Sequence, residues 1–197
     1  MTEPTTTANT IARERVDTLA TRNSEPAWVK ELRLNAWESY MQTPAPAQRD
    51  EEWRKIELAP LDLSLLKTVD FPAGPSQTKQ PQDLPKWFEQ ALRDFTGRAG
   101  VITTTTKGIW CELSQEAREK GVIFCSLKTA LQEHHALVRP YLEKKLAHDG
   151  KFGLMNKALF NSGVFLYVPP NVELNGVLLS LVHVAAEDTK LGMAVFP

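Results

Sequence analysis

The first half of the chain places its apolar residues mainly at helical spacing. Ile11, Val16 and Leu19 share one face, which predicts a helix from Thr10. Ser24 stands where it could cap a second helix. The expected face of that second helix is aromatic-rich and consists of Trp28, Leu32, Ala36, Trp37, Tyr40 and Met41. The segment TPAPAQ, residues 43–48, predicts its end, and residues 84–95 predict a further helix.

The next part of the chain mixes short segments of both kinds. Strands are expected at 101–106, 108–113 and 122–125, where β-branched and apolar residues gather. Between the last two, Ser114 begins a short helix that Gly121 ends. Residues 127–145 predict a long helical segment that Pro140 kinks or restarts. Helical spacing then returns up to Gly163, which is expected to free the backbone for a turn.

The most strand-like material is VFLYV and VLLSLVHV, residues 164–168 and 177–184, on either side of Pro169-Pro170. The second run is apolar on both faces, a pattern typical of strands covered on both sides, as in parallel or stacked sheets. Helices come first, mixed elements next and strands last. This order predicts an α+β fold rather than an even alternation of strands and helices.

Composition narrows the class of protein. The chain has 197 residues, 42% of them hydrophobic and 24% charged, with a net charge of −1. These values are ordinary for a globular protein and give no global field for nucleic acid or an anionic membrane. No apolar run approaches the roughly 20 residues that span a bilayer, and the first residues lack a secretory pattern. Two cysteines favour a reducing cytoplasm.

Candidate metal ligands do not form a recognisable motif. His134 and His135 are adjacent on an expected helix, and His148 and Asp149 follow it. His183 lies within a strand-like run. Cys111 and Cys125 are fourteen residues apart, without the close pairs that zinc sites use. We therefore assign no metal, cofactor-binding or catalytic residue.

Candidate nucleophiles are equally weak. Asn161-Ser162-Gly163 lacks the first glycine and the strand-to-helix order of a nucleophile elbow. Cys125 lies in an apolar strand without a nearby basic residue, which favours an inert thiol. Phosphate-binding loops are absent, and the tryptophans follow helical spacing rather than forming a stacking surface for bases. The residues indicate a scaffold or interaction protein.

Two segments resemble the SufD branch of the SufB/SufD family. Residues 51–58, EEWRKIEL, are similar to an E-x-W-R segment near the start of the family, and Leu61 follows as expected. Residues 121–144 and then 152–184 resemble the pattern "S-L-x-x-A", a helix, and "F-x-x-L-N-x-A-x-x-x-G-x-x-[IL]-x-V-P-x-x-V". The residues that fill the last part are Phe152, Met155, Asn156, Ala158, Gly163, Leu166, Val168, Pro169 and Val172.

The resemblance implies the N-terminal portion of a scaffold subunit for iron–sulfur cluster assembly. It implies a helical and mixed domain over 11–150. The first coils of a right-handed parallel β-helix are then expected over 151–197. A disordered tail over residues 1–10 is predicted from their composition, since they hold five threonines and no large apolar residue except Met1. SufB-like and SufC-like subunits, the latter an ATPase, are the implied partners. Cluster ligands and ATPase contacts are expected beyond Pro197, so this chain should hold no cluster itself.

Two alternatives remain open at this stage. One is a small cytosolic α/β enzyme that uses Cys125 or Ser162, and the other is a stand-alone β-solenoid binding module. The expected function is non-catalytic and cytoplasmic, through protein partners and without nucleic acid or membrane.

Overall fold

The chain divides into two compact units that are each built from distant segments. The computed structural model describes residues 13–47, 49–55, 67–68, 86–105, 108–144, 150–183 and 193–194. The first unit is Met1–Val69, Ala136–Asn161 and Asp188–Pro197, and the second unit is Asp70–His135 and Ser162–Glu187. The expected tail over residues 1–10 lies outside the described residues, and the domain boundary expected at residue 150 stays a prediction.

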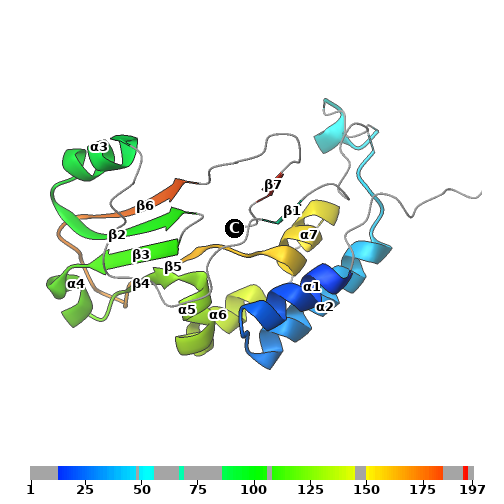
Figure 1. Ribbon diagram of the computed structural model, residues 1–197, viewed down its shortest axis with the longest axis horizontal. Coiled ribbons are helices and arrows are strands. Elements are labelled where there is room, and N and C mark those ends of the chain that lie inside the picture. Colours follow the sequence, from blue (N-terminus) through cyan, green and yellow to red (C-terminus); the bar gives the residue numbers. More distant parts are fainter. Residues whose placement is uncertain are drawn as a thin grey trace, which may run out of the picture. The chain divides into compact units, whose positions relative to one another are not determined.

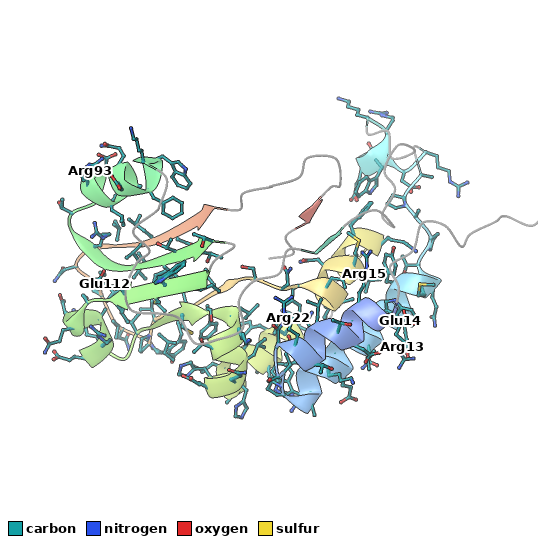
Figure 2. All side chains as sticks on the ribbon, in the orientation of Figure 1. Arg13, Glu14, Arg15, Arg22, Arg93 and Glu112 are labelled. Carbon is teal, nitrogen blue, oxygen red and sulfur yellow. The ribbon has the colours of Figure 1, made fainter. Side chains whose placement is uncertain are left out.

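The first unit is mainly helical (Figure 1). It contains α1 (Arg13–Arg22), α2 (Ala27–Gln42), η1 (Glu51–Trp53), α7 (Lys151–Leu159) and all but the first residue of α6 (His135–Leu142). Two short strands, β1 (Lys67–Thr68) and β7 (Met193–Ala194), pair in parallel. Charged side chains of α1, among them Arg13 and Glu14, are exposed on its surface (Figure 2).

The second helix differs from its prediction at both its start and its inner face. Pro26 precedes the first residue of α2 without a side-chain cap, and Ser24 has a φ of 51°. Ser24 is therefore a residue of the α1–α2 turn, and its predicted capping role is wrong. The end at Gln42 confirms the break predicted at TPAPAQ. The buried face consists of Val29, Leu32, Arg33, Ala36 and Tyr40, with Trp28 and Trp37 half-buried at its sides.

The second unit contains a three-stranded sheet, a two-stranded sheet and short helices. Its elements are α3 (Lys86–Asp94), β2 (Arg98–Thr105), β3 (Gly108–Leu113), α4 (Gln115–Glu119), β4 (Ile123–Ser126), α5 (Leu127–Glu133), β5 (Val164–Tyr167) and β6 (Val177–His183). β2 lies in the middle of its sheet, antiparallel to β3 and parallel to β6 (Figure 1). β4 and β5 form an antiparallel pair. The strands predicted near residues 101, 108 and 122 are confirmed.

The α+β character is confirmed, but the predicted opening of a right-handed parallel β-helix is wrong. The described strands form three small sheets rather than stacked coils. The two apolar runs after Gly163 find their partners earlier in the chain, because β5 returns antiparallel onto β4 and β6 adds parallel to β2. Gly176, with a φ of 124°, and Asn171, with a φ of 62°, lie in the connection between them. The same sheets give no support to a β-solenoid module.

The helix predicted over residues 127–145 is two helices in the described part of this segment. α5 ends at Glu133, and His134 caps it with its backbone amide bonded to Ala130 O. Pro140 lies inside α6 and marks no boundary. Ser114 and Gly121 act as predicted: the Ser114 hydroxyl accepts from Ala117 N, and Gly121 has a φ of 77°.

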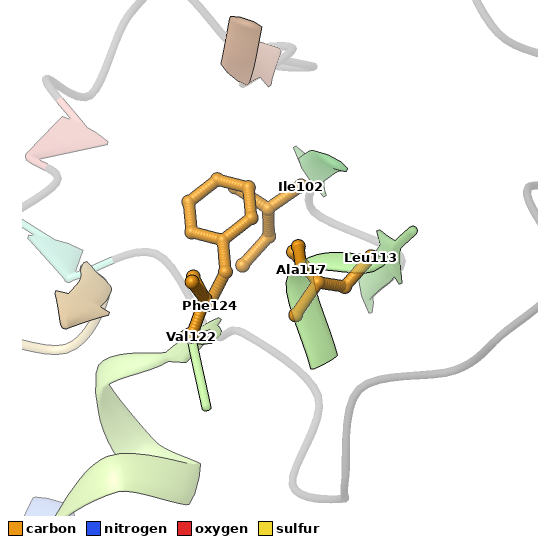
Figure 3. Packing of buried hydrophobic residues seen from close by; sticks show 5 residues of the cluster. All are labelled: Ile102, Leu113, Ala117, Val122 and Phe124. Carbon is orange, nitrogen blue, oxygen red and sulfur yellow. The ribbon is translucent and has the colours of Figure 1, made fainter. Parts of the chain in front are cut away.

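The core of the second unit lies between its two sheets and α4. It consists of Ile102, Leu113, Ala117, Val122 and Phe124 (Figure 3). Cys111 and Val172 are among the partly buried residues packed against it. Gly100 permits this packing, because a Cβ there would stand 2.8 Å from Leu113 Cδ1 and 3.0 Å from Leu178 Cδ2. In the described part of the chain, no helix has the length and apolar character needed to cross a membrane.

Candidate interaction surface

The two segments that resemble the SufB/SufD pattern meet in the first unit. The ring of Trp53, in η1, lies 5.2 Å from the ring of Phe152, in α7, at an interplanar angle of 34°. Aromatic pairs at this separation add about 0.5–1.5 kcal/mol beyond the area they bury. The packing of Trp53 against Phe152 thus gives a structural reason for a tryptophan in the segment 51–58 and a phenylalanine at the start of the segment 152–184. Residues 56–58 and Leu61 of the pattern lie outside the described residues.

Two further residues of the pattern, Leu127 and Gly163, are in contact in the second unit. A Cβ at Gly163 would stand 3.0 Å from Leu127 Cδ2, and Gly163 O accepts from Leu127 N at 2.9 Å. Ser126, just before Leu127, caps α5 by accepting from Thr129 N. Gly163 has no left-handed φ, so it serves close approach rather than the backbone freedom predicted for it.

The connection from β5 to β6 is tied to α4 and to the core. Val172 packs against the hydrophobic cluster. Lys120 Nζ donates to Glu173 O at 2.8 Å and to Glu116 Oε1 at 2.6 Å. The hydrogen bond and charge of Lys120 hold the pKa of the exposed Glu116 carboxyl below its ordinary value. These contacts explain why the chain turns after Pro169-Pro170 and returns to the sheet.

Two pattern residues, Leu166 and Val168, are not explained by packing within the described residues. They and Val164 are exposed by 47%, 38% and 36%. In the β4–β5 register Leu166 stands opposite Phe124 and Val164 opposite Ser126. Opposed residues of an antiparallel pair share a face of the sheet. The face that is buried at Phe124 therefore continues uncovered along β5.

We call Val164, Leu166 and Val168 the β5 row. Val164 and Leu166 are exposed on one face of β5, and the exposed Val168, the residue after the strand, continues the alternation. Single exposed apolar residues need no explanation, but three at alternate positions do. The alternation of apolar residues is visible in the sequence, but the face that would be covered could not be predicted, because it depends on β5 pairing with β4. The β5 row is the candidate interaction surface of the second unit.

The two cysteines are near each other but are poorly suited to act as a nucleophile or as a dithiol site. Cys111 Sγ donates to Phe124 O at 2.8 Å. Burial raises the pKa of Cys111 to about 11 and that of Cys125 to about 12. Phe124 points into the core that Cys111 also contacts, and successive residues of a strand point to opposite faces, so Cys125 points away from it. The pair thus lacks both the thiolate and the common face that a dithiol site requires.

The other candidate residues weighed in the sequence are not brought together either. In the described part of the chain, no hydrogen bond joins Ser162 or Cys125 to a histidine or carboxylate that could act as a base. Nor do three or more His, Cys, Asp or Glu side chains among these residues group so that they could hold a metal ion. His148 and Asp149 lie outside the described residues, and of His183 only the backbone, in β6, is described.

Comparison with known proteins gives the family. A family model described as "SufBD protein N-terminal region" matches residues 13–178. The iron–sulfur cluster assembly protein SufD of Bacillus subtilis is 28% identical over 195 residues, which cover 92% of this chain and 40% of that protein. Iron–sulfur cluster assembly SufBD family proteins of Synechocystis and Staphylococcus epidermidis are 24% and 26% identical, over 91% and 88% of this chain.

The matched relatives are much longer than this chain, which spans about two fifths of their length: 40%, 39% and 38%. The match itself is continuous from α1 to β6, so it includes both units. The chain therefore belongs to the SufBD family, within the N-terminal region of that family.

Proposed function

We propose that this chain is part of a non-enzymatic scaffold subunit that assembles iron–sulfur clusters in the cytoplasm together with SufB-like and SufC-like partners. The family membership and the printed names of the relatives, which are iron–sulfur cluster assembly proteins, support the process. The nascent cluster is the cargo of the complex. Its ligands are expected outside this chain.

The observation that carries a scaffold role is the β5 row. It is an apolar strand face, continuous with the core of the second unit and exposed at Val164, Leu166 and Val168. Apolar surface of this kind gains free energy when a partner covers it, at roughly 25 cal/mol per Å². The thiols support the non-enzymatic part, because a raised pKa keeps Cys111 and Cys125 protonated near neutral pH.

Co-purification tests the proposal. The full-length subunit that contains this chain is expressed with the SufB-like and SufC-like proteins of its organism and run on size exclusion, where we expect a co-eluting complex. A double variant, Leu166→Thr with Val168→Thr, keeps strand-forming side chains while removing apolar surface. It should weaken the complex at least about tenfold, since about 1.4 kcal/mol of lost contact is enough.

The matched control is Val177→Thr. Val177 is 43% exposed and lies in β6 of the same unit, but not in the β5 row. It should leave the complex unchanged. Absence of any complex with either partner would contradict the scaffold function, whereas a complex insensitive to the double variant would contradict only the role of the β5 row.

A further inference from the structure

Arg33, in the first half of α2, binds the C-terminal end of α7. Its guanidinium donates to Ala158 O at 3.0 Å and to Phe160 O at 2.7 Å, and it lies 3.7 Å from the centre of the Phe160 ring. Arg33 is fully buried. Glu25 supplies the counter-charge through two hydrogen bonds of 2.7 Å from Arg33 Nε and Nη2.

Lys151, the first residue of α7, does the same for the C-terminal end of α2. Its Nζ donates to Tyr40 O at 2.9 Å and to Thr43 O at 2.8 Å, and it lies 4.2 Å from the centre of the Tyr40 ring. Desolvation lowers the pKa of Lys151. The two helices are thus antiparallel, and each contributes a cation to the far end of the other.

The chemistry of helix ends explains why cations suit both places. The last carbonyls of a helix have no partner within the helix and carry a partial negative charge. The buried guanidinium of Arg33 and the half-buried ammonium of Lys151 each satisfy two of them at once, and the aromatic face beside each cation adds a cation–π contact. We name these two contacts the Arg33 clasp and the Lys151 clasp.

The clasps are reciprocal, so opening one end of the helix pair releases carbonyls of one helix and the cation of the other. We propose that the Arg33 clasp and the Lys151 clasp couple α2 and α7 into one cooperative unit, so that the two helices unfold locally and refold together. Breaking either clasp then loosens both helices along their full length, including the end at which the other clasp stays intact.

Native-state hydrogen exchange on the whole chain tests this. Lys151→Met keeps the aliphatic stem and removes the charge and its hydrogen bonds. We expect the exchange of α7 amides near Ala158 and Leu159, at the opposite end from the substitution, to rise about tenfold, together with amides throughout α2. Amides of β2 and β3, in the second unit, should keep their rates and serve as the internal reference.

The matched control is Lys157→Met, in the same helix. Lys157 Nζ donates to Lys144 O at 3.3 Å, an exposed contact outside both clasps. Its removal should leave the exchange of α2 unchanged. The reverse experiment uses Arg33→Lys, which keeps a cation but loses the forked geometry. It should raise exchange at Leu154, whose amide is bonded to Gly150 O in the first turn of α7.

Two results would overturn the proposal. One is a rise confined to the residues within a turn of Lys151 and of Thr43, with the Arg33 end unchanged. The other is an equal rise in β2 and β3, since the helix pair would then not be a unit of its own.

Discussion

The two units differ in which polar groups they bury. The first unit buries a charged side chain completely, that of Arg33. In the second unit the buried polar side chains are the hydroxyls of Thr103, Thr104, Thr105 and Ser126. Removing a partner costs about 3–5 kcal/mol for a buried ion pair and about 1–3 kcal/mol for a buried hydroxyl. We therefore expect the stability of the first unit to depend most on its buried charged side chains. The second unit contains close-packed glycines, among them Gly100 and Gly176, and we expect its stability to depend most on these.

The largest expected effect is at Arg33. Arg33→Met leaves Glu25 buried without its counter-charge and leaves Ala158 O and Phe160 O without their donor. Breaking a buried pair in this way costs about 3–5 kcal/mol of the free energy of unfolding. Urea unfolding followed by circular dichroism measures it.

The control for Arg33 lies on the same helix. Lys30 forms an exposed ion pair with Asp17 at 3.2 Å, and Lys30→Met should cost at most about 1 kcal/mol. Equal losses for the two variants would remove the distinction between buried and exposed charge on which the comparison rests.

The next effect is at Gly176, in the second unit. Its φ is 124°, and an added Cβ would stand 2.4 Å from Gly97 O and 2.9 Å from Ala99 N. Gly176→Ala should cost about 1–3 kcal/mol because both the backbone and the start of the β2–β6 ladder must shift. Gly97→Ala is the matched control, since a Cβ there meets nothing within 4 Å. Thermal unfolding of both variants decides whether the second unit is sensitive at its glycines.

A third prediction concerns the thiols of the second unit. With pKa values near 11 and 12 against an ordinary 9.0, Cys111 and Cys125 should react with a thiol reagent about 100-fold and about 1000-fold more slowly in the folded chain than in urea. Single variants, Cys125→Ala and Cys111→Ala, separate the two rates. A rate in the folded chain equal to that in urea would show that burial does not suppress the thiolate.

The same pKa shifts set a direction for stability at high pH. A thiol whose folded pKa is raised contributes its full stability below pH 9 and loses it as the pH rises toward the folded values near 11 and 12. The wild-type chain should therefore lose more stability between pH 9 and 11 than a variant with both cysteines replaced by alanine. Urea unfolding at the two pH values measures the difference.

The smallest effect is at the surface of α4. The Glu116 pKa is lowered by Lys120, so the stability it contributes is present above its ordinary value of 4.5 and is lost as the pH falls through the lowered value. Glu116→Gln should lower the melting temperature slightly at pH 7 and not at pH 2. Glu119, whose carboxylate accepts from Gln115 on the same helix, is the control position. A difference that persists at the low pH would point to lost packing instead of lost charge.

Local features of the fold could be predicted from the sequence, and long-range pairings could not. Ser114, Gly121 and the break after Gln42 act through neighbours within a few residues, and each was predictable. The partners of β5 and β6 could not be predicted, because the alternation of a strand does not say which strand it joins. The β-helix expected from the resemblance failed at this point.

Arg33 shows how a signal in the sequence could have revealed more of the first unit. Its position matches the apolar face of α2, between Leu32 and Ala36 and four residues after Val29. A charge on that face predicts a buried partner, which proved to be Glu25 and the end of α7. The β5 row could not be predicted in the same way. Every residue of β5 is apolar or aromatic, so either face of the strand, the one with Phe165 or the one with Leu166, could equally well have been the buried one.

The central position of β2 has a consequence for synthesis. Its neighbour β3 follows it within a few residues, whereas β6 is made only when the ribosome reaches residues 177–183. Until then the nascent β2–β3 hairpin carries an open edge, because the hydrogen-bonding groups that β6 later pairs have no partner strand. During this interval the open edge of β2 is the place where the growing chain could pair with a strand of another molecule.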